Sequence, residues 1–487
     1  MKKNKIKNIV LSASVVFALF VGNTAFSEPA LTSQPDEQAF SQAVNQIPEL
    51  RKEESAKPEE NLNIAAEAKT PMVEVNTTTN KVDQNIIPVL ELKGGVKEKA
   101  AEQPSILKSW IQGDYLTGNW GGLRTKLEDH GITFAGSYMT DSFQKFRGGS
   151  KSETPFKTFG LVDTNLTLDT KKMGLWPGGT AFVRFQNKHG LGLSQDYIGD
   201  IQSYDSYESR RFAQISEYWY EQSVFNDRFK LKAGKQDANT DFCALDSGFN
   251  FINSSYSYMP TMPMPSYPDP ALGLTATIKP VDWLAIRSGW FDGEGKGGTS
   301  GFDTAFDGKG GSFFIEELGV KHNLKNHPGN YLAGYWLHTG HVDELSADPA
   351  PRVFGQNVGW YAAAEQMLFK ENKDENDDQG LTILGQFGWS PSDRSEVARY
   401  YGAGLQYKGL IPRRDQDIFG FGTAIAKLSG RLRDVDGRYG KESILESFYT
   451  IQLTPWLSIQ NDMQFIFHPN GQEKSAFVMG ARTLITF

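Results

Sequence analysis

Several short segments of the sequence carry polar side chains at every second position. In residues 180–187, Arg184 and Gln186 alternate with apolar residues, so the two polar groups share one face. Charged and amide groups can exchange hydrogen bonds with the hydroxyls of a polar solute, and an indole ring offers a flat apolar face. The candidate binding residues chosen in this way are Arg184, Gln186, Glu217, Trp219, Glu221 and Lys232.

An alternative for the charged members of this set is that they pair with one another and only stiffen the structure. The same alternation puts Lys230 and Gln236 on the face of Lys232, and it groups Asp163 with three further polar residues, namely Asn165, Thr167 and Asp169. The shared orientation of these side chains is therefore a firmer prediction than their contact with a solute.

Catalytic and metal chemistry find little support in the sequence. The seven histidines are scattered, and no serine or cysteine shares a strand face with one in a way that would make a nucleophile. His338 and His341 resemble a metal pair, but their spacing puts the rings on opposite faces of a strand, and no cysteine or carboxylate cluster completes a ligand shell. No phosphate loop or dinucleotide fingerprint is present. We therefore predict no enzymatic activity, no catalytic residue, no metal and no cofactor.

The candidate side chains recur at every second position, and side chains point to the same face with this period in β-strands. We therefore expect β-strands to position them. Residues 445–453 and 457–467 alternate in this way and flank Thr454-Pro455-Trp456, a short turn in which proline costs no ladder hydrogen bond. The polar stretches 293–311 and 371–380 are expected to be long loops on the rim opposite the short turns. Further strands are expected at 162–170, 180–187, 215–225, 229–236, 272–278, 283–291, 381–389 and 400–407.

The end of the chain favours a membrane barrel over a soluble β-sandwich, which is the alternative. Residues 477–487 alternate, with mostly apolar side chains at every second place, and the chain ends in Phe487. A mean hydropathy of −0.44 fits a barrel, because half of each strand faces water in the lumen. The fold class is therefore all-β, a transmembrane antiparallel β-barrel.

The region before the barrel has a different composition. Residues 1–27 run from lysines through an apolar stretch to small residues, which predicts a secretory signal peptide. Residues 28–109 hold a single aromatic, Phe40, and we predict a low-complexity, disordered periplasmic linker that is a plain spacer or reaches peptidoglycan. The barrel domain is expected over 110–487. The net charge of −8 argues against nucleic acid as a partner.

Two segments are candidates for plugs. Residues 120–127 have helical spacing, which predicts a short helix at the periplasmic mouth, or a tether that helps assembly, with Arg124, Lys126 and Glu128 facing outward. The Met- and Pro-rich run 259–270 is expected to be a solvated extracellular loop, with folding into the lumen as the alternative.

Motifs distributed over 110–487 closely resemble the carbohydrate-selective porin (OprB) family. Asn119 stands where that family usually has Asp, and a helix cap tolerates either residue. Residues 28–109 lie outside the resemblance. The matching segments include 116–127 (LTGNWGGLRTKL), 175–179 (LWPGG), 217–222 (EYWYEQ), 234–237 (GKQD), 251–255 (FINSS), 336–340 (WLHTG) and 453–457 (LTPWL).

The resemblance implies a monomeric barrel of sixteen strands in the outer membrane, with inward loops and a narrow waist that favours monosaccharides. The function to be expected is passive diffusion of small, glucose-like sugars into the periplasm. The expected partners are the transported sugars, outer-membrane lipid and the barrel-assembly machinery, with peptidoglycan contact through the tail. The alternative is a structural tether between the outer membrane and the cell wall, with only general diffusion through the barrel.

Overall fold

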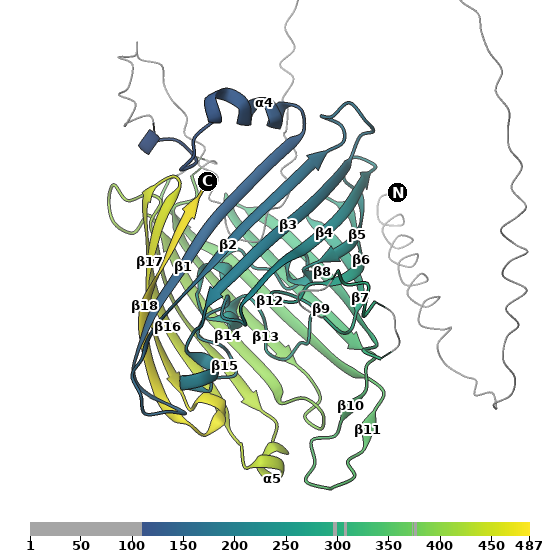
Figure 1. Ribbon diagram of the computed structural model, residues 1–487, viewed down its shortest axis with the longest axis vertical. Helices are drawn as coiled ribbons and strands as arrows, with labels where there is room; N and C mark the ends of the chain where they lie inside the picture. The colour runs from purple at the N-terminus through teal and green to yellow at the C-terminus, as the bar shows by residue number, and fades with distance from the viewer. Residues whose placement is uncertain (1–109, 296–299, 306–308, 373, 375–376) are drawn as a thin grey trace, which may run out of the picture. The chain divides into compact units, whose positions relative to one another are not determined.

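The computed structural model describes residues 110–295, 300–305, 309–372, 374 and 377–487, and within them sixteen antiparallel strands close into a barrel (Figure 1). Each strand pairs with its neighbours in the chain, and β18 pairs with β1 to complete the ring. The signal peptide and linker expected at 1–27 and 28–109 lie outside the described residues.

The first eight strands are β1 (Ile132–Gly149), β2 (Phe156–Asp169), β3 (Gly179–Gly190), β4 (Phe212–Val224), β5 (Phe229–Gln236), β6 (Ala271–Val281), β7 (Leu284–Asp292) and β8 (Ser312–Leu324). The others are β9 (His327–His338), β12 (Asn357–Lys370), β13 (Gly380–Trp389), β14 (Val397–Lys408), β15 (Ile418–Leu428), β16 (Lys441–Thr454), β17 (Leu457–Phe467) and β18 (Lys474–Thr486).

The remaining elements are short and are not strands of the barrel wall. A small two-stranded sheet joins β10 (Val342–Asp343) to β11 (Val353–Phe354). No helix in the described part of the chain is long and apolar enough to cross a membrane. The helices are η1 (Trp120–Gly122), α4 (Leu123–Asp129), η2 (Ser194–Ile198), η3 (Ala238–Thr240), η4 (Gly248–Asn250), η5 (Ser254–Tyr256), α5 (Leu432–Asp436) and η6 (Pro469–Gly471).

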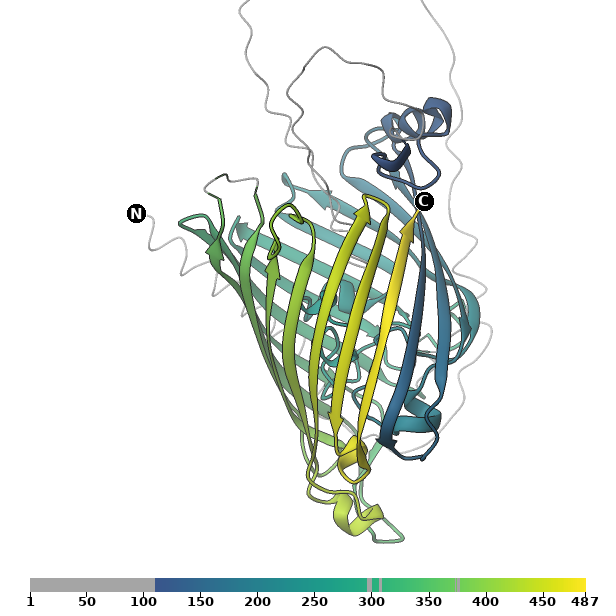
Figure 2. The ribbon, with the colours of Figure 1, turned by 90° about the vertical axis from the view of Figure 1, so that its left-hand side faces the viewer.

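The two rims of the barrel differ in the length of their connections. One rim carries α4, the C-terminus and tight turns such as 282–283 and 325–326 (Figures 1 and 2). The opposite rim carries the long loops 191–211, 237–270, 293–311 and 339–356. Outer-membrane barrels have short periplasmic turns and longer extracellular loops, which identifies the two rims. The expectation for 371–380 was wrong: 371–379 joins β12 to β13 on the rim of the short turns, because strand direction, not polarity, decides the rim.

The wall shows the alternation that the sequence predicts. On β18, Phe477, Met479 and Ile485 pair with outward residues of β17, while Arg482 points inward and pairs with Asp141 of β1. The backbone N–H of Phe487 donates to the Gly136 carbonyl of β1 at 2.8 Å, so the C-terminus reaches across the closing seam. Outward aromatic rings form a belt near the extracellular rim, where Phe387 lies 4.9 Å from Trp360 and 5.2 Å from Tyr401.

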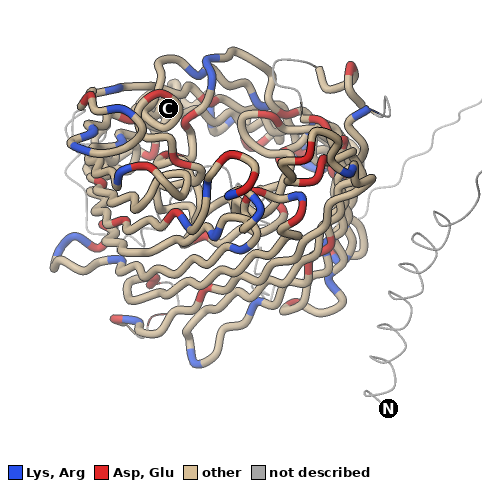
Figure 3. The backbone as a smooth tube through the Cα atoms, turned by 90° about the horizontal axis from the view of Figure 1, so that it is seen from below, with Lys and Arg blue, Asp and Glu red and all other residues tan. Residues whose placement is uncertain are grey.

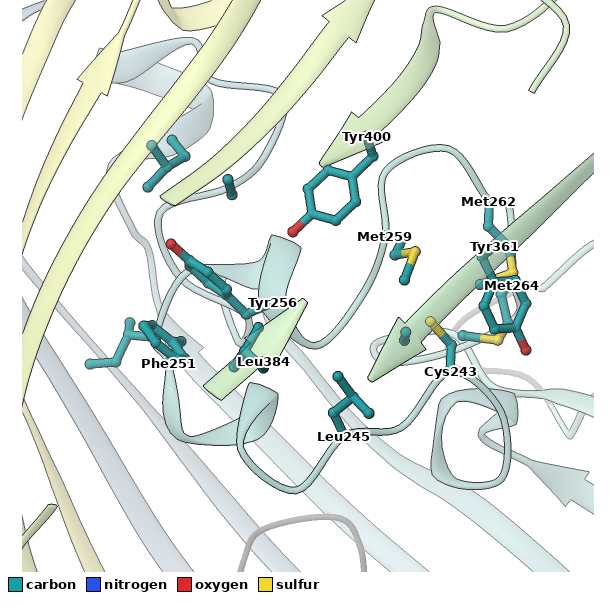
Figure 4. Close-up of a cluster of buried hydrophobic side chains, with 14 of the residues drawn as sticks. Cys243, Leu245, Phe251, Tyr256, Met259, Met262, Met264, Tyr361, Leu384 and Tyr400 are labelled. Carbon is teal, nitrogen blue, oxygen red and sulfur yellow. The ribbon is translucent and has the colours of Figure 1, made fainter. Parts of the chain in front are cut away.

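Two long loops, 191–211 and 237–270, fold into the lumen and pack on the inner wall. Their apolar side chains form one buried cluster with wall residues such as Trp336, Tyr361 and Tyr400. Figure 4 shows part of this cluster, with Tyr361 and Tyr400 of the wall beside residues of the 237–270 loop. Met259, Met262 and Met264 belong to this cluster and are at most 4% exposed. The expectation of a solvated loop at 259–270 was therefore wrong, because the unbranched methionine side chains fill gaps against the wall instead.

The segment before β1 docks on the periplasmic rim. Trp110 packs on Trp456 with ring centroids 4.9 Å apart, and the Leu116 N–H donates to the Thr486 carbonyl. The Asn119 Oδ1 atom accepts the Thr125 N–H at 3.0 Å and so satisfies a backbone donor in the first turn of α4, whose N-cap residue is Gly122. The outward position expected for Arg124 was wrong, because its guanidinium lies over the Tyr115 and Trp120 rings and leaves the side chain buried.

Candidate functional site

Arg184 is the centre of a charged network on the inner wall of β2, β3 and β4. Its Nε atom donates to the Asp163 Oδ1 atom at 2.9 Å, and its Nη1 atom donates to the Glu217 Oε1 atom at 3.0 Å. Gln186 donates to Asp163 at 2.8 Å and accepts from the Ser216 hydroxyl at 2.6 Å. A bulge in the β3–β4 pairing at this point turns both Ser216 and Glu217 toward the interior.

The network is covered by the loop that follows β5. Glu217 uses its second oxygen to accept the backbone N–H of Asp237, the first residue of the 237–270 loop, at 3.0 Å. Arg184, Gln186 and Glu217 are each no more than 3% exposed. The sequence therefore predicts their inward orientation correctly, but all three lie beneath the loop and have little surface for a solute.

The other three predicted residues lie closer to the periplasmic end and form a second group. The Trp219 ring stacks on Phe182 at 4.7 Å, and the Lys232 ammonium lies 5.1 Å from the Trp219 ring centroid. Lys232 pairs with Asp241 of the inward loop, and Glu221 pairs with Lys230 at 3.2 Å. The side chains of Glu221, Lys230 and Asp241 are 23%, 29% and 25% exposed, so this group is partly open.

Carboxylates of the inner wall hold the backbone of the 237–270 loop at four points. Glu317 of β8 accepts the Cys243 N–H at 2.7 Å, and Glu365 of β12 accepts the Ser247 N–H at 2.8 Å. Glu446 of β16 accepts the Ile252 N–H at 2.7 Å and the Asn253 N–H at 3.2 Å. With Glu217 on β4, these acceptors lie on strands around the ring, so the loop is fixed across the lumen.

Amides of the wall complete this attachment. Gln386 and Gln460 donate to the Tyr256 and Asn250 carbonyls at 2.8 Å each, and Gln406 donates to the Ser247 carbonyl. Backbone groups of a loop inside a barrel have no ladder partners, so side chains of the wall must satisfy them. The loop therefore keeps one position, which is the condition for a constriction of fixed width. Figure 3 shows loop segments with charges of both signs inside the ring.

The 191–211 loop is attached in the same way to β16–β18. Glu442 accepts the Ile201 and Gln202 N–H groups at 2.9 Å each. Arg482 donates to Asp141 on the wall and to Asp205 on the loop, at 2.9 Å in both cases. Both inward loops are therefore held by charged groups that face the lumen.

Sequence reasoning missed the wall glutamates Glu317, Glu365, Glu442 and Glu446. A signal was available for Glu365 and Glu446, because each stands at a position whose strand parity faces inward. The parity argument gives the direction of a side chain, but it cannot identify a partner on a distant loop.

Burial changes the acidity of carboxyl groups in the inward loops. Burial, together with the nearby Glu217 carboxylate, raises the pKa of Asp237 to about 6. Burial also raises the pKa of Glu208 to about 7, and the Asp200 carboxylate adds to this shift. Within the described residues, no group of three or more His, Cys, Asp or Glu side chains is arranged to hold a metal ion.

Comparisons with known proteins agree with this architecture. A family model described as carbohydrate-selective porin, OprB family, matches residues 155–487. Porin B of Pseudomonas aeruginosa is 23% identical over 440 residues, which cover 81% of this chain and 94% of that protein. The putative porin QuiX of Acinetobacter baylyi is 22% identical over 429 residues, which cover 78% of this chain and 94% of that protein.

A solved structure shares the fold. The high-pH structure of Pseudomonas putida OprB covers 77% of this chain and 99% of its own, with a TM-score of 0.71 and 21% sequence identity. The low-pH structure of the same protein also covers 77% of this chain and 99% of its own, with a TM-score of 0.51 and 18% sequence identity.

Proposed function

The chain belongs to the carbohydrate-selective porin (OprB) family, and from this premise we propose that it lets glucose-like monosaccharides diffuse across the outer membrane into the periplasm. The protein is an outer-membrane β-barrel, and its relatives are porins rather than enzymes. The proposal is carried by one observation: the 237–270 loop is fixed across the lumen by wall carboxylates and leaves a partly open polar group at its edge.

The partly open group supplies the chemistry that a sugar needs. Glu221, Lys230 and Asp241 offer acceptors and donors of both charge signs, which suits a neutral solute with many hydroxyls. Trp219 adds a partly exposed ring against which the C–H faces of a pyranose can pack. Binding has to remain weak, since a tightly held solute leaves the pore slowly.

We assign the buried network a positioning role. Arg184, Gln186 and Glu217 hold the start of the inward loop through the Asp237 N–H, so they set the width of the pore without touching the solute. Lys232 has the same positioning role, because it is buried beside the Trp219 ring and pairs with Asp241 of the loop.

Liposome swelling with a ladder of sugars from pentose to trisaccharide tests the proposal. Monosaccharides should enter at clearly higher rates than disaccharides, and millimolar glucose should partly block the ion current in planar bilayers. Trp219→Ala should weaken this block by about 1–3 kcal/mol, or roughly fivefold to 150-fold, if the ring packs on the sugar. Lys171→Gln, on an exposed periplasmic turn, is the matched control and should leave the block unchanged. Equal block by amino acids and sugars would contradict the proposed selectivity.

A further inference from the structure

Three cationic side chains stand side by side on the barrel at its extracellular rim. Arg399 of β14 is the direct cross-strand partner of Lys427 on β15, and Lys427 is the direct partner of Lys441 on β16. All three side chains are exposed. Directly opposed residues on one sheet face have Cβ atoms ~4.5–5.5 Å apart, so these charges form one continuous row. We name Arg399, Lys427 and Lys441 the cationic row.

The cationic row points away from the lumen. The residues that alternate with it, Tyr400, Ala426 and Glu442, are completely buried inside the barrel. The next residues of the same parity along these strands are Tyr401 and Ile425, which pair with each other on the outer face. The row therefore continues the membrane-facing surface at its outer end.

The row has no balancing anion in the described part of the chain, where none of its three members forms an ion pair. Two carboxylates of the neighbouring rim loops, Glu396 and Asp436, already bind Arg438 at 3.0 and 2.6 Å. Glu442, beside Lys441 in sequence, turns inward and accepts two backbone N–H groups of the 191–211 loop. Like charges directly opposite each other destabilise a sheet, so the row needs a counter-anion from outside the chain.

The height of the row matches the headgroup region of a membrane. Tyr401 lies on β14 two residues closer to the periplasm than Arg399. Its ring is 5.2 Å from that of Phe387 in the outer aromatic belt. Aromatic belts mark the interface between hydrocarbon and headgroups. Cations one step beyond the belt therefore lie where lipid headgroups carry their phosphates.

We propose that the cationic row binds the phosphate groups of a lipid in the outer leaflet of the outer membrane. Arginine can bind a phosphate through two parallel N–H bonds, and the two lysines add point charges beside it. A lipid fits better than free phosphate because the same strands continue below the row into an apolar outward surface that acyl chains can cover. That surface includes Leu405, Phe421, Ile425 and Leu445. The inference does not depend on the proposed sugar transport.

A triple variant, Arg399→Gln with Lys427→Gln and Lys441→Gln, tests the proposal in the full-length protein. The control triple, Lys126→Gln with Lys171→Gln and Arg413→Gln, removes the same charge from exposed positions at the periplasmic rim. Folding of each variant is checked by heat-modifiable gel mobility. Binding of diphosphoryl lipid A, its dephosphorylated form and inorganic phosphate is then measured in detergent by native mass spectrometry and competition.

The native chain and the control triple should retain diphosphoryl lipid A equally. Each cation near a charged membrane surface contributes roughly fivefold in affinity, so removal of all three should weaken binding by about a hundredfold. If the row variant does not fold, Lys427→Gln alone should still lose about fivefold. Equal retention by the row variant, or equal affinity for the dephosphorylated lipid, would overturn the proposal. Displacement of the lipid by inorganic phosphate at comparable concentration would contradict the proposal that the bound phosphate belongs to a lipid.

Discussion

At the scale of single residues, the interior of this barrel depends on carboxylates that accept backbone N–H groups. A loop inside a barrel cannot use the strand ladder, and each unsatisfied buried N–H costs about 1–3 kcal/mol. Glu217, Glu317, Glu365 and Glu446 remove that cost for the 237–270 loop. The charges of the lumen therefore hold the constriction in place before they contact any solute.

The Glu446→Gln variant should loosen the far end of the 237–270 loop. The substituted amide presents an NH₂ group to the Ile252 and Asn253 N–H groups, so one acceptor is lost and the free energy of unfolding falls by about 1–3 kcal/mol. Single-channel recordings should show larger and noisier conductance, and thermal unfolding in detergent should occur at a lower Tm.

The matched control is Glu396→Gln, which removes a carboxylate from an exposed ion pair with Arg438. Exposed pairs contribute only about 0–1 kcal/mol, so its conductance and Tm should stay near those of the native chain. Unchanged conductance in Glu446→Gln would show that the wall carboxylates do not set the pore.

The 191–211 loop should respond to pH through Asp200, whose pKa is raised to about 6 by burial. Two further carboxylates, Glu208 and Glu442, are close enough for the Asp200 charge to act on them. A carboxyl whose folded pKa is raised gives stability at pH below its usual value of 3.8, and this stability is lost as the pH rises through 6.

The Asp200→Asn variant should therefore raise the Tm at pH 8 and leave it nearly unchanged at a pH below 3.8, where the native carboxyl is protonated in both the folded and the unfolded chain. The largest gain is about 3 kcal/mol, the equivalent of a shift of roughly two pKa units. Thermal unfolding at the two pH values measures the difference, and an equal change at both would refute the role of the Asp200 charge.

At the scale of elements, the sequence predicts these strands well because apolar and polar side chains alternate with a two-residue period in each of the segments expected to be a strand. The ten strands expected between 162 and 467 all appear, with shifts of a few residues at their ends. The alternation also predicts the inward direction of the six candidate residues, which are Arg184, Gln186, Glu217, Trp219, Glu221 and Lys232. It does not show which of them a loop will cover, since that depends on a contact with Asp237 that no local pattern encodes.

The errors have a common physical cause, which is that composition alone does not place a connecting segment. The polar 371–379 segment lies on the periplasmic rim, and the Met-rich run 259–264 lies against the inner wall. Arg124 is covered by two aromatic rings although its helical position suggested an outward direction. In each case tertiary packing decides the position.

The closing seam between β1 and β18 yields a prediction at the same scale. A Cβ atom at Gly136 would lie 2.7 Å from the Phe487 ring, so Gly136→Val should displace the C-terminal residue and lower the yield of folded barrel. Gly385→Val is the matched control, because a Cβ atom at this outward strand position meets no atom within 4 Å. Heat-modifiable gel mobility after refolding measures both variants, and equal yields would show that the seam tolerates the added side chain.

At the scale of the whole molecule, the barrel begins with its own anchored segment. Trp110 and Leu116 attach the chain to the periplasmic rim through Trp456 and Thr486, and all sixteen strands of the wall lie within residues 132–486. This arrangement allows the roles of the barrel and of residues 28–109 to be separated by experiment.

Deletion of 28–109, with the signal segment 1–27 retained, should leave the folded yield, the Tm and the sugar flux of the barrel unchanged. Within the residues that the structure describes, the wall strands and the contacts of Trp110 and Leu116 all remain in the deleted form, so we expect no loss of stability. Liposome swelling with glucose measures the flux, and electron microscopy of cells that express the deleted form reports the envelope. Unchanged flux together with blebbing of the outer membrane would support a wall tether in the linker, in addition to transport through the barrel. Reduced flux in the deleted form would instead show that the linker takes part in transport, because the pore groups Glu221, Lys230 and Asp241 are all retained.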